Sequence, residues 1–301
     1  MIVSNADRVV FPEDGLTKGD IAAYYETVSE RLLGFIADRA LTVERYPKGI
    51  GGEGFMQKNA PEHLTDETIG RHQVSKDGGG TTVYPVVRDR EGILAFANLG
   101  VITFHAPPST VEDPGHPDWV IWDLDPPAGR FDLARAAAVA LEETLESFGV
   151  TTGLMTSGSN GYHLRSKLDG SAKAETVAWL ARALGAVSAS EHPSLLTLAF
   201  KKSEREGKVF VDWLRNAPYS TSVSPWSLRP RSGAPVATPI AWEEIDAIDP
   251  NSVRMQDAPA RLEADPWAGL QRLDMGQMTQ PVEEALQAKG IVLQPFDRFR
   301  S

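Results

Sequence analysis

The nine residues WVIWDLDPP, from Trp119 to Pro127, constrain the fold of this 301-residue chain more than any other stretch. The apolar run predicts a β-strand. Side chains alternate along a strand, so Asp123 and Asp125 share one face while Leu124 points to the other. Two neighbouring carboxylates at a strand end repel each other unless a cation lies between them. Hard oxygen ligands suit Mg²⁺ or Mn²⁺, and the chain has no cysteine as a softer ligand, so we expect a metal site here.

Composition places the chain among ordinary globular proteins, because 42% of its residues are hydrophobic and 24% are charged. The absence of cysteine excludes disulfides and thiol chemistry. The first residues, MIVSNADRVVF, lack a signal-peptide pattern, and no apolar run reaches the roughly 18 residues that a membrane-spanning helix needs. We therefore expect a cytoplasmic protein with no membrane partner.

The net charge of −11 argues against indiscriminate binding to nucleic acid. Residues 201–231 reverse this sign locally: they hold seven basic and three acidic side chains, a net of +4, which leaves −15 for the rest. A solvated surface loop is one reading of such a cluster, and an anion-binding surface is the other.

Hydrophobic periodicity and turn residues predict a mixed α/β (α+β) fold with two lobes and a cleft between them. We expect helices at 17–38, 131–148 and 172–184, and strands at 41–45, 55–58, 83–87, 101–104, 119–123, 154–156, 162–166, 196–200 and 209–213. The whole chain, 1–301, is read as one catalytic domain: an N-terminal lobe at about 1–100, a metal-bearing lobe at about 101–247, and a helical segment at about 248–301 that includes the last forty residues.

A third aspartate, Asp212, follows another β-branched and aromatic run in KVFVDWLRN. Three aspartates on strand ends can converge and hold two divalent ions, an arrangement that polymerases and nucleases use. Taken alone, an aspartate in the position of Asp212 is more often a strand-end cap or a turn former than a metal ligand. The nearby Asp123 and Asp125 favour the metal site.

The segment from Ser157 to His163, SGSNGYH, predicts a glycine-containing turn between two short strands. Such a turn can present backbone N–H groups and a hydroxyl to phosphate, with His163 as a further donor. A simple hairpin with a core histidine is the alternative. The KLDG that follows matches the KxDG around the lysine nucleophile of ATP-dependent ligases, but Asp and Gly are also usual in a strand-to-helix turn, so we treat Lys167 as a coincidental match.

Three arginines, Arg205, Arg215 and Arg229, flank Asp212 in the sequence. Guanidinium groups beside a metal ion and a triphosphate neutralise charge during phosphoryl transfer. Long arginine side chains also cover apolar surface, which is the alternative role for each of them.

Longer motifs in order give the chain a resemblance to the polymerase domain of bacterial ligase D, a branch of the archaeo-eukaryotic primase superfamily. The similar segments are NADRVVFPEDGLTKGDIAAYY, GFMQKNAPEHL, NLGVITFHAPPS, WVIWDLDPP, TSGSNGYHL, GKVFVDWLRN and SVSPWSLRPRSGAPVATPIAWEEI. The resemblance implies an archaeo-eukaryotic primase-like catalytic fold with central mixed β-sheets flanked by helices.

The resemblance also implies roles for individual residues. Asp123, Asp125 and Asp212 correspond to the metal ligands of the family, with Asp212 binding only the catalytic ion. The positions that correspond to nucleotide contacts are Ser157, Ser159, Asn160, His163, His105, Arg205 and Arg229. Asn5, Arg8 and Lys18 correspond to a pocket for the 5′-phosphate of the DNA strand beyond a gap, and Phe55 and Met56 to residues that stack on the template.

Three departures from the family pattern are visible. Asn160 stands where family members usually carry lysine, Met56 where a second phenylalanine is common, and Arg8 where lysine is more usual. The first removes a positive contact to the triphosphate and the third keeps the charge. The resemblance covers no ligase or nuclease domain, as in a stand-alone relative or an excised polymerase domain.

These observations predict a primase-polymerase: a nucleotidyltransferase that adds ribo- or deoxynucleotides to primer 3′ ends at gaps or broken DNA ends, with two Mn²⁺ or Mg²⁺ ions. One ion activates the 3′-hydroxyl and the second holds the triphosphate and the departing pyrophosphate. The resemblance implies a bacterial, nucleoid-associated role in non-homologous end joining, with primer-template DNA as partner and with Ku and a separate ligase as candidate partners. The alternatives are a DNA-end-binding module with weak or lost polymerase activity and, from Lys167, a self-adenylating ligase.

Overall fold

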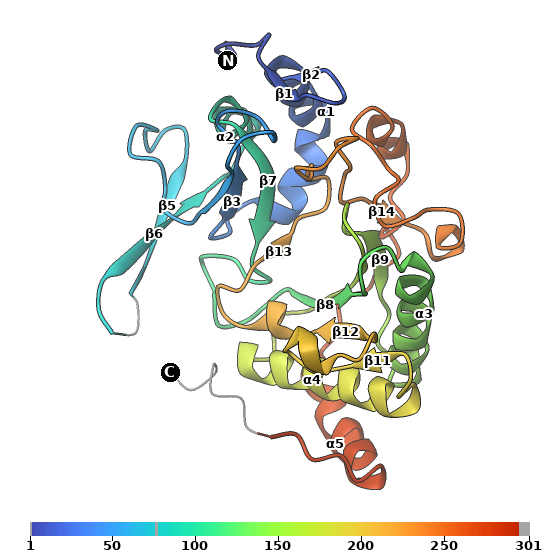
Figure 1. The fold of residues 1–301 in the computed structure, drawn as a ribbon. Helices are drawn as coiled ribbons and strands as arrows, with labels where there is room; N and C mark the ends of the chain where they lie inside the picture. The colour runs from blue at the N-terminus through green and yellow to red at the C-terminus, as the bar shows by residue number, and fades with distance from the viewer. Residues whose placement is uncertain (1, 76–77, 295–301) are drawn as a thin grey trace.

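A computed structural model describes residues 2–75 and 78–294, and within them two large β-sheets form the framework (Figure 1). The larger sheet has the strand order β11-β12-β8-β10-β9-β14, and the smaller has the order β13-β7-β3-β4. β11 runs parallel to β12, whereas the other neighbours in the larger sheet are antiparallel. The predicted mixed α/β fold is confirmed.

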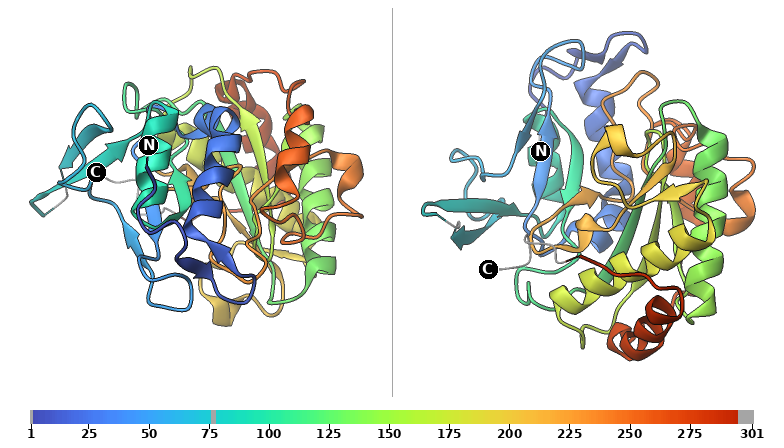
Figure 2. Two further views of the ribbon diagram at one scale, coloured as in Figure 1. Left: turned by 90° about the horizontal axis from the view of Figure 1, so that it is seen from above. Right: turned by 60° about the horizontal axis from the view of Figure 1, so that its bottom comes forward.

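The larger sheet carries two long helices on one face. Its strands are β8 (Trp119–Asp125), β9 (Gly153–Thr156), β10 (Tyr162–Lys167), β11 (Leu196–Thr197), β12 (Val209–Asp212) and β14 (Pro239–Ile240). The helices α3 (Phe131–Ser147) and α4 (Ala174–Glu191) lie along the same side of this sheet, away from the N-terminal part of the chain (Figure 2). Their apolar faces and the sheet form one buried cluster.

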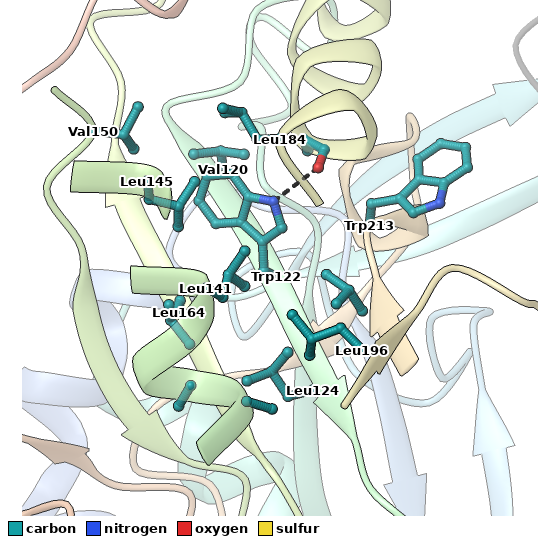
Figure 3. Packing of buried hydrophobic residues seen from close by; sticks show 14 of the residues in the cluster. Val120, Trp122, Leu124, Leu141, Leu145, Val150, Leu164, Leu184, Leu196 and Trp213 are labelled. Atoms are coloured by element: carbon teal, nitrogen blue, oxygen red, sulfur yellow. Dashed lines mark hydrogen bonds between the residues drawn. The ribbon is translucent and has the colours of Figure 1, made fainter. Parts of the chain in front are cut away.

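β8 is the central element of this packing. Val120, Trp122 and Leu124 point into the buried cluster that the sheet forms with α3 and α4 (Figure 3). There the indole N–H of Trp122 donates to the carbonyl of Ala181 on α4 at 2.9 Å. On the opposite face, Trp119 and Ile121 are also buried. A strand that is covered on both faces has a continuous run of apolar residues in its sequence. In β8 this run is first interrupted at Asp123, whose side chain lines a pocket.

The smaller sheet is antiparallel and carries the first two helices. Its strands are β3 (Thr42–Arg45), β4 (Phe55–Gln57), β7 (Val101–Ala106) and β13 (Ser222–Val223), and α1 (Lys18–Ile36) and α2 (Arg90–Asn98) pack on it. α1 begins with a capping box, in which the side chains of Thr17 and Asp20 each bond the backbone N–H of the other residue. β13 pairs with β7, so a strand from the later part of the chain joins this sheet.

The remaining elements are short hairpins and turns. β1 (Val9–Phe11) pairs with β2 (Leu16–Thr17), and β5 (Gly70–Ser75) pairs with β6 (Thr81–Val86) in a hairpin that extends away from the main body in Figure 1. The 3₁₀ turns are η1 (Lys202–Glu204), η2 (Leu214–Asn216), η3 (Trp242–Glu244), η4 (Ala258–Glu263) and η5 (Met275–Met278). No helix within the described ranges is long and apolar enough to cross a membrane.

Three sequence expectations need correction. The strand predicted at 196–200 ends at Thr197, because the Thr197 hydroxyl accepts the N–H of Ala199 and turns the chain off the sheet. The helix predicted at 172–184 continues to Glu191 and ends just before Pro193. Gly185 does not end the helix; it allows close packing, since a Cβ there would lie 3.3 Å from the side chain of Val211. The last forty residues are helical only in part: as far as residue 294 they hold the end of η4, η5 and α5 (Thr279–Ala288) with irregular segments between and after them, and 295–301 lie outside the described residues.

Candidate functional site

The register of three neighbouring strands brings Asp212, Asp123 and His163 into one row. Asp123 on β8 is directly opposite Asp212 on β12 and directly opposite His163 on β10. Residues paired in this way point to the same face of a sheet, and so does Asp125, two positions along β8. Residues 123, 163 and 212, far apart in the sequence, therefore form one site, as the sequence predicts.

The carboxylate of Asp123 is held by two neighbours. His163 Nε2 lies 3.1 Å from Asp123 Oδ1, and Arg215 Nε lies 3.1 Å from Asp123 Oδ2. Burial lowers the pKa of His163, so the neutral imidazole donates from Nε2 and leaves Nδ1 without a partner among the described residues. Burial opposes ionisation of Asp123, but His163 and Arg215 outweigh it and hold the pKa of Asp123 below its ordinary value.

Asp125 and Asp212 have less compensation. Burial, together with the nearby charges of Asp123 and Asp212, raises the pKa of Asp125 to about 7; Arg205, 3.7 Å away, offsets this only in part. Burial also raises the pKa of Asp212, although its carboxylate accepts the Leu214 N–H at 2.9 Å and contacts Arg215 at 3.0 Å. Three carboxylates concentrated in this way favour binding of a cation.

The turn between β9 and β10 is the tight hairpin that the sequence predicts, and it requires both glycines. Gly158 has φ +64°, and a Cβ there would lie 2.6 Å from the Arg229 side chain; a Cβ on Gly161 would lie 1.8 Å from the carbonyl oxygen of Leu124. The Ser157 hydroxyl accepts the N–H groups of Ser159 and Gly161, each at 3.2 Å. These two N–H groups thus shape the turn, whereas we expected them to be free for phosphate.

A pocket of about 270 Å³ opens where the two sheets meet, above Asp123 and Asp125. Its walls come from β8, from the 157–161 turn, from β13 and from His105 on β7. Every residue that the family resemblance assigns to nucleotide binding lines it: His105, Ser157, Ser159, Asn160, His163, Arg205 and Arg229. The structure therefore gathers this predicted set around one cavity.

Some side chains of the pocket have buried nitrogen atoms that make no hydrogen bond within the described part of the chain. His105 Nε2 and Arg229 Nε are buried atoms with no hydrogen-bond partner within residues 2–75 and 78–294. Burial, with Arg229 and Arg215 nearby, lowers the pKa of His105 to about 3, and burial lowers the pKa of Arg229 as well. Arg205 lies with its guanidinium 4.1 Å from the ring centre of Phe210. Such groups are suited to an anionic ligand that supplies the missing bonds.

Sequence reasoning missed the direct contact of Arg215 with two aspartates and the contribution of Lys202 to the pocket wall. Arg215 lies three residues after Asp212, in the turn η2 that follows β12. That spacing was the available signal, because residues three apart across a helical turn are neighbours.

The donor set suits a hard divalent cation, because Asp123 and Asp125 supply carboxylate oxygens to the pocket and Asp212 lies directly beside Asp123 on the neighbouring strand. Within the described part of the chain, however, no three His, Cys, Asp or Glu side chains are placed to hold one ion together. The guanidinium of Arg215 lies between Asp123 and Asp212 and is the cation that these two carboxylates share.

The three residues assigned to a 5′-phosphate pocket lie together at the start of α1. The backbone N–H of Arg8 donates to the carbonyl of Asn5 at 3.1 Å, and the N–H of Lys18 donates to the carbonyl of Arg8 at 2.9 Å. The Lys18 ammonium is buried and bonds the carbonyl and hydroxyl of Ser4 and the amide oxygen of Asn98, at 2.6, 3.0 and 2.6 Å. An ammonium has three N–H donors, so all those of Lys18 are in use.

Phe55 and Met56 lie on β4, at the edge of the smaller sheet, and are 46% and 51% exposed. Arg45 lies over the Phe55 ring at 5.5 Å. Exposed apolar side chains on an edge strand leave a surface on which bases could stack. Lys167 lies elsewhere, at the end of β10, in a different pocket beside Trp119 and Trp267.

Comparison with known proteins agrees with this geometry. Residues 17–267 match the family model of the LigD primase-polymerase domain. The chain is 35% identical over 258 residues to the multifunctional non-homologous end joining DNA repair protein LigD of Mycobacterium tuberculosis, covering 81% of this chain and 33% of that protein. It is 31% identical over 246 residues to the bifunctional non-homologous end joining protein LigD of Bacillus subtilis, covering 81% and 39%.

Among solved structures, the polymerase domain of Mycobacterium tuberculosis ligase D in complex with DNA matches with a TM-score of 0.81 and 32% identity, covering 88% of this chain and 95% of that one. The fold is thus that of the archaeo-eukaryotic primases. The chain belongs to the LigD primase-polymerase domain family, whose LigD relatives act in non-homologous end joining DNA repair. It spans about a third of the length of the mycobacterial LigD proteins that it matches.

Proposed function

We propose that this chain is a template-dependent nucleotidyltransferase that adds nucleotides to primer 3′ ends at gaps or broken DNA ends during end joining. One observation carries the proposal: Asp212, Asp123 and His163 lie in one row across three strands, and Asp123 and His163 of this row line a pocket that is also lined with cations. Carboxylates for metal ions beside cations for a triphosphate are what phosphoryl transfer requires.

Asp123, Asp125 and Asp212 would hold divalent ions of the Mg²⁺ or Mn²⁺ type. Two such ions, when bound, supply positive charge to the attacking and leaving oxygens of a nucleotidyl transfer. The residues of the chain do the rest: His163 keeps Asp123 oriented through its 3.1 Å contact, and Ser157 fixes the shape of the turn beside the pocket.

Cations from the locally basic segment and His105 would bind the nucleotide. Arg205 and Arg229 line the pocket, and the unpartnered Nε of Arg229 is available to a triphosphate oxygen. His105, kept neutral by burial, can hydrogen bond to a sugar hydroxyl without repelling the neighbouring guanidinium groups. The DNA partner would lie over the exposed Phe55 and Met56, and Arg8 would approach a 5′-phosphate.

The test is primer extension on gapped DNA with a 5′-phosphate, with Mn²⁺ or Mg²⁺ and with ribo- or deoxynucleotides. Asp123→Asn, Asp125→Asn and Asp212→Asn should each slow extension by about 100-fold or more, because each removes a metal ligand in the reaction centre. Ser171→Ala is the control, because Ser171 lies in an exposed turn and does not line the pocket; this variant should extend primers at the wild-type rate. Wild-type rates from the Asp123 and Asp125 variants would place the chemistry elsewhere.

A second outcome would favour a binding module. Asn160 and Met56 are the residues in the pocket and on β4 that depart from the family pattern. Tight binding of the 5′-phosphorylated gap, without extension with any nucleotide or either metal, would identify a DNA-end-binding protein that has lost catalysis. The dephosphorylated gap is the control for 5′-phosphate recognition.

A further inference from the structure

Arg215 bridges two carboxylates that belong to neighbouring strands. Its Nε lies 3.1 Å from Asp123 Oδ2, and its Nη2 lies 3.0 Å from Asp212 Oδ2. A guanidinium presents donors in a planar fork, so one side chain can neutralise charge at both positions. The protein itself therefore supplies a cation at the place where two strand-end carboxylates meet.

The backbone beneath Arg215 is fixed. The fully buried amide of Asn216 accepts the N–H of Ile121 at 2.8 Å and donates to the carbonyl of Ile121 at 2.7 Å and to that of Trp213 at 2.8 Å. These bonds tie the turn η2 to β8 two residues before Asp123. Any movement at Arg215 thus belongs to its side chain, which is 36% exposed and lines the pocket.

All four oxygens of the bridged pair already have a donor. Those of Asp123 contact His163 and Arg215, and those of Asp212 contact the Leu214 N–H and Arg215. An ion that binds between these carboxylates has to replace the guanidinium, because two cations cannot share that space without strong repulsion.

We propose that Arg215 sets the metal affinity of this site: its guanidinium holds the place of the ion between Asp123 and Asp212 and swings into the pocket when the ion binds. The proposal rests on the proposed function, because it concerns the same carboxylates. The apparent affinity for the ion is the affinity of the free site multiplied by the fraction of molecules in which the side chain has left, so a small fraction means weak binding. A released guanidinium joins the cations of the pocket, so metal and nucleotide strengthen each other's binding, and this coupling is reciprocal.

The experiment measures binding of Mn²⁺ alone to the 301-residue chain, by the electron paramagnetic resonance signal of free Mn²⁺. Arg215→Gln should lower the Kd for Mn²⁺ by about tenfold, as expected if about one molecule in ten has the site free. The matched control is Lys202→Gln, which removes the same charge from the lining of the same pocket; within the described residues, Lys202 makes no ion pair. Its Kd should change by about twofold at most, because its charge is exposed and screened.

Each outcome decides the matter. If Arg215→Gln binds Mn²⁺ no more tightly than wild type, Arg215 does not compete with the ion, and the proposal fails while primer extension by the wild type keeps the proposed function intact. If no variant binds Mn²⁺ even at millimolar concentrations, the proposal and the metal site fail together. Should Arg215→Gln not fold, Arg215→Lys has to bind Mn²⁺ more tightly than wild type, because one ammonium cannot replace the fork.

The coupling provides a readout that a merely structural role would not change. In wild type, a saturating nucleoside triphosphate should tighten Mn²⁺ binding by a larger factor than in Arg215→Gln. An equal factor in both proteins would show that the guanidinium does not move toward the nucleotide when the ion binds, which contradicts the proposed swing.

Discussion

The central pocket and the cluster at the start of α1 were both assigned to phosphate, yet their cations are built in opposite ways. In the pocket, Arg229 Nε and His105 Nε2 are buried and find no partner among residues the structure describes. At the start of α1, the three donors of Lys18 are all used by Ser4 and Asn98. The comparison teaches that burial of a cation alone does not identify a ligand site; unused bonding capacity beside a pocket is the stronger sign.

The two regions should also differ in what they contribute to folding. A buried donor without a partner costs about 1–3 kcal/mol, whereas hydrogen bonds from a charged group contribute about 1.5–3 kcal/mol each. The pocket therefore lowers the stability of the free protein, and the cluster at α1 raises it. Within that cluster, Arg8 resembles the pocket residues, because its Nε is buried and unpartnered.

The largest effect is expected at Lys18. Lys18→Met removes the ammonium and leaves the oxygens of Ser4 and Asn98 without their donor, so the free energy of unfolding should fall by about 2–4 kcal/mol. Urea denaturation followed by circular dichroism measures it. Arg8→Met is the control: it should cost less than about 1 kcal/mol and should still weaken the preference for a 5′-phosphate. If Arg8→Met lowers the free energy of unfolding as much as Lys18→Met does, Arg8 and Lys18 do not differ in their contribution to stability.

Arg229→Gln should show the opposite pattern. Loss of the guanidinium should weaken nucleoside triphosphate binding by about 10- to 100-fold, since charge-assisted bonds to phosphate are lost. The free energy of unfolding should stay the same or rise, because a buried charge with an unpartnered Nε is removed. Isothermal titration calorimetry and urea denaturation report the two quantities. A variant that loses stability but keeps its nucleotide affinity would make Arg229 a structural residue.

Much of this framework could be predicted from the sequence, because its signals are local. The capping box at Thr17 and Asp20, the alternation along β8 and the Gly158 and Gly161 turn each depend on a few adjacent residues. The two-residue strands β13 and β14 could not be delimited, because pairing with strands far away in the sequence defines them. No local pattern marks where such a strand ends.

Sequence patterns indicated which residues belong to the candidate site, but not the contacts between their side chains. The three aspartates and the pocket residues were found from strand ends, a turn and the family resemblance. That Arg215 would bridge two of the aspartates depends on the docking of Asn216 against Ile121, 95 residues away. The three-residue spacing of Arg215 from Asp212 indicates that one pair, but nothing in the sequence indicates the contact of Asn216 with Ile121 that places Arg215 beside Asp123.

A smaller effect on stability is expected at Asp125 and should depend on pH. Its pKa is raised from 3.8 to about 7 by burial and by Asp123 and Asp212, so the folded protein holds this proton more tightly than the unfolded chain. Stability from this group is therefore present below about pH 4 and is lost as the pH rises through 7. The side chain is 47% exposed, and screening by solvent keeps the loss to about 1–2 kcal/mol.

Asp125→Asn removes this titration. Without metal ions, the variant should be about 1–2 kcal/mol more stable than wild type at pH 8 and equal to it at pH 4, as measured by urea denaturation at both values. An equal difference at the two pH values would mean that Asp125 is ionised throughout. The central pocket would then not lower the stability of the protein relative to the cluster at the start of α1.

The smallest effect is expected at Asn160, which lines the pocket in the half-buried turn after β9. Asn160→Lys adds a cation to a wall that already holds Arg205 and Arg229, so nucleoside triphosphate binding should tighten by about threefold, and less at high salt. Asn160→Gln, longer than asparagine but uncharged, is the control and should bind like wild type. If glutamine tightens binding as much as lysine, or if the gain persists at high salt, contact area at this position matters and charge does not. The central pocket would then already hold all the positive charge that its ligand can use.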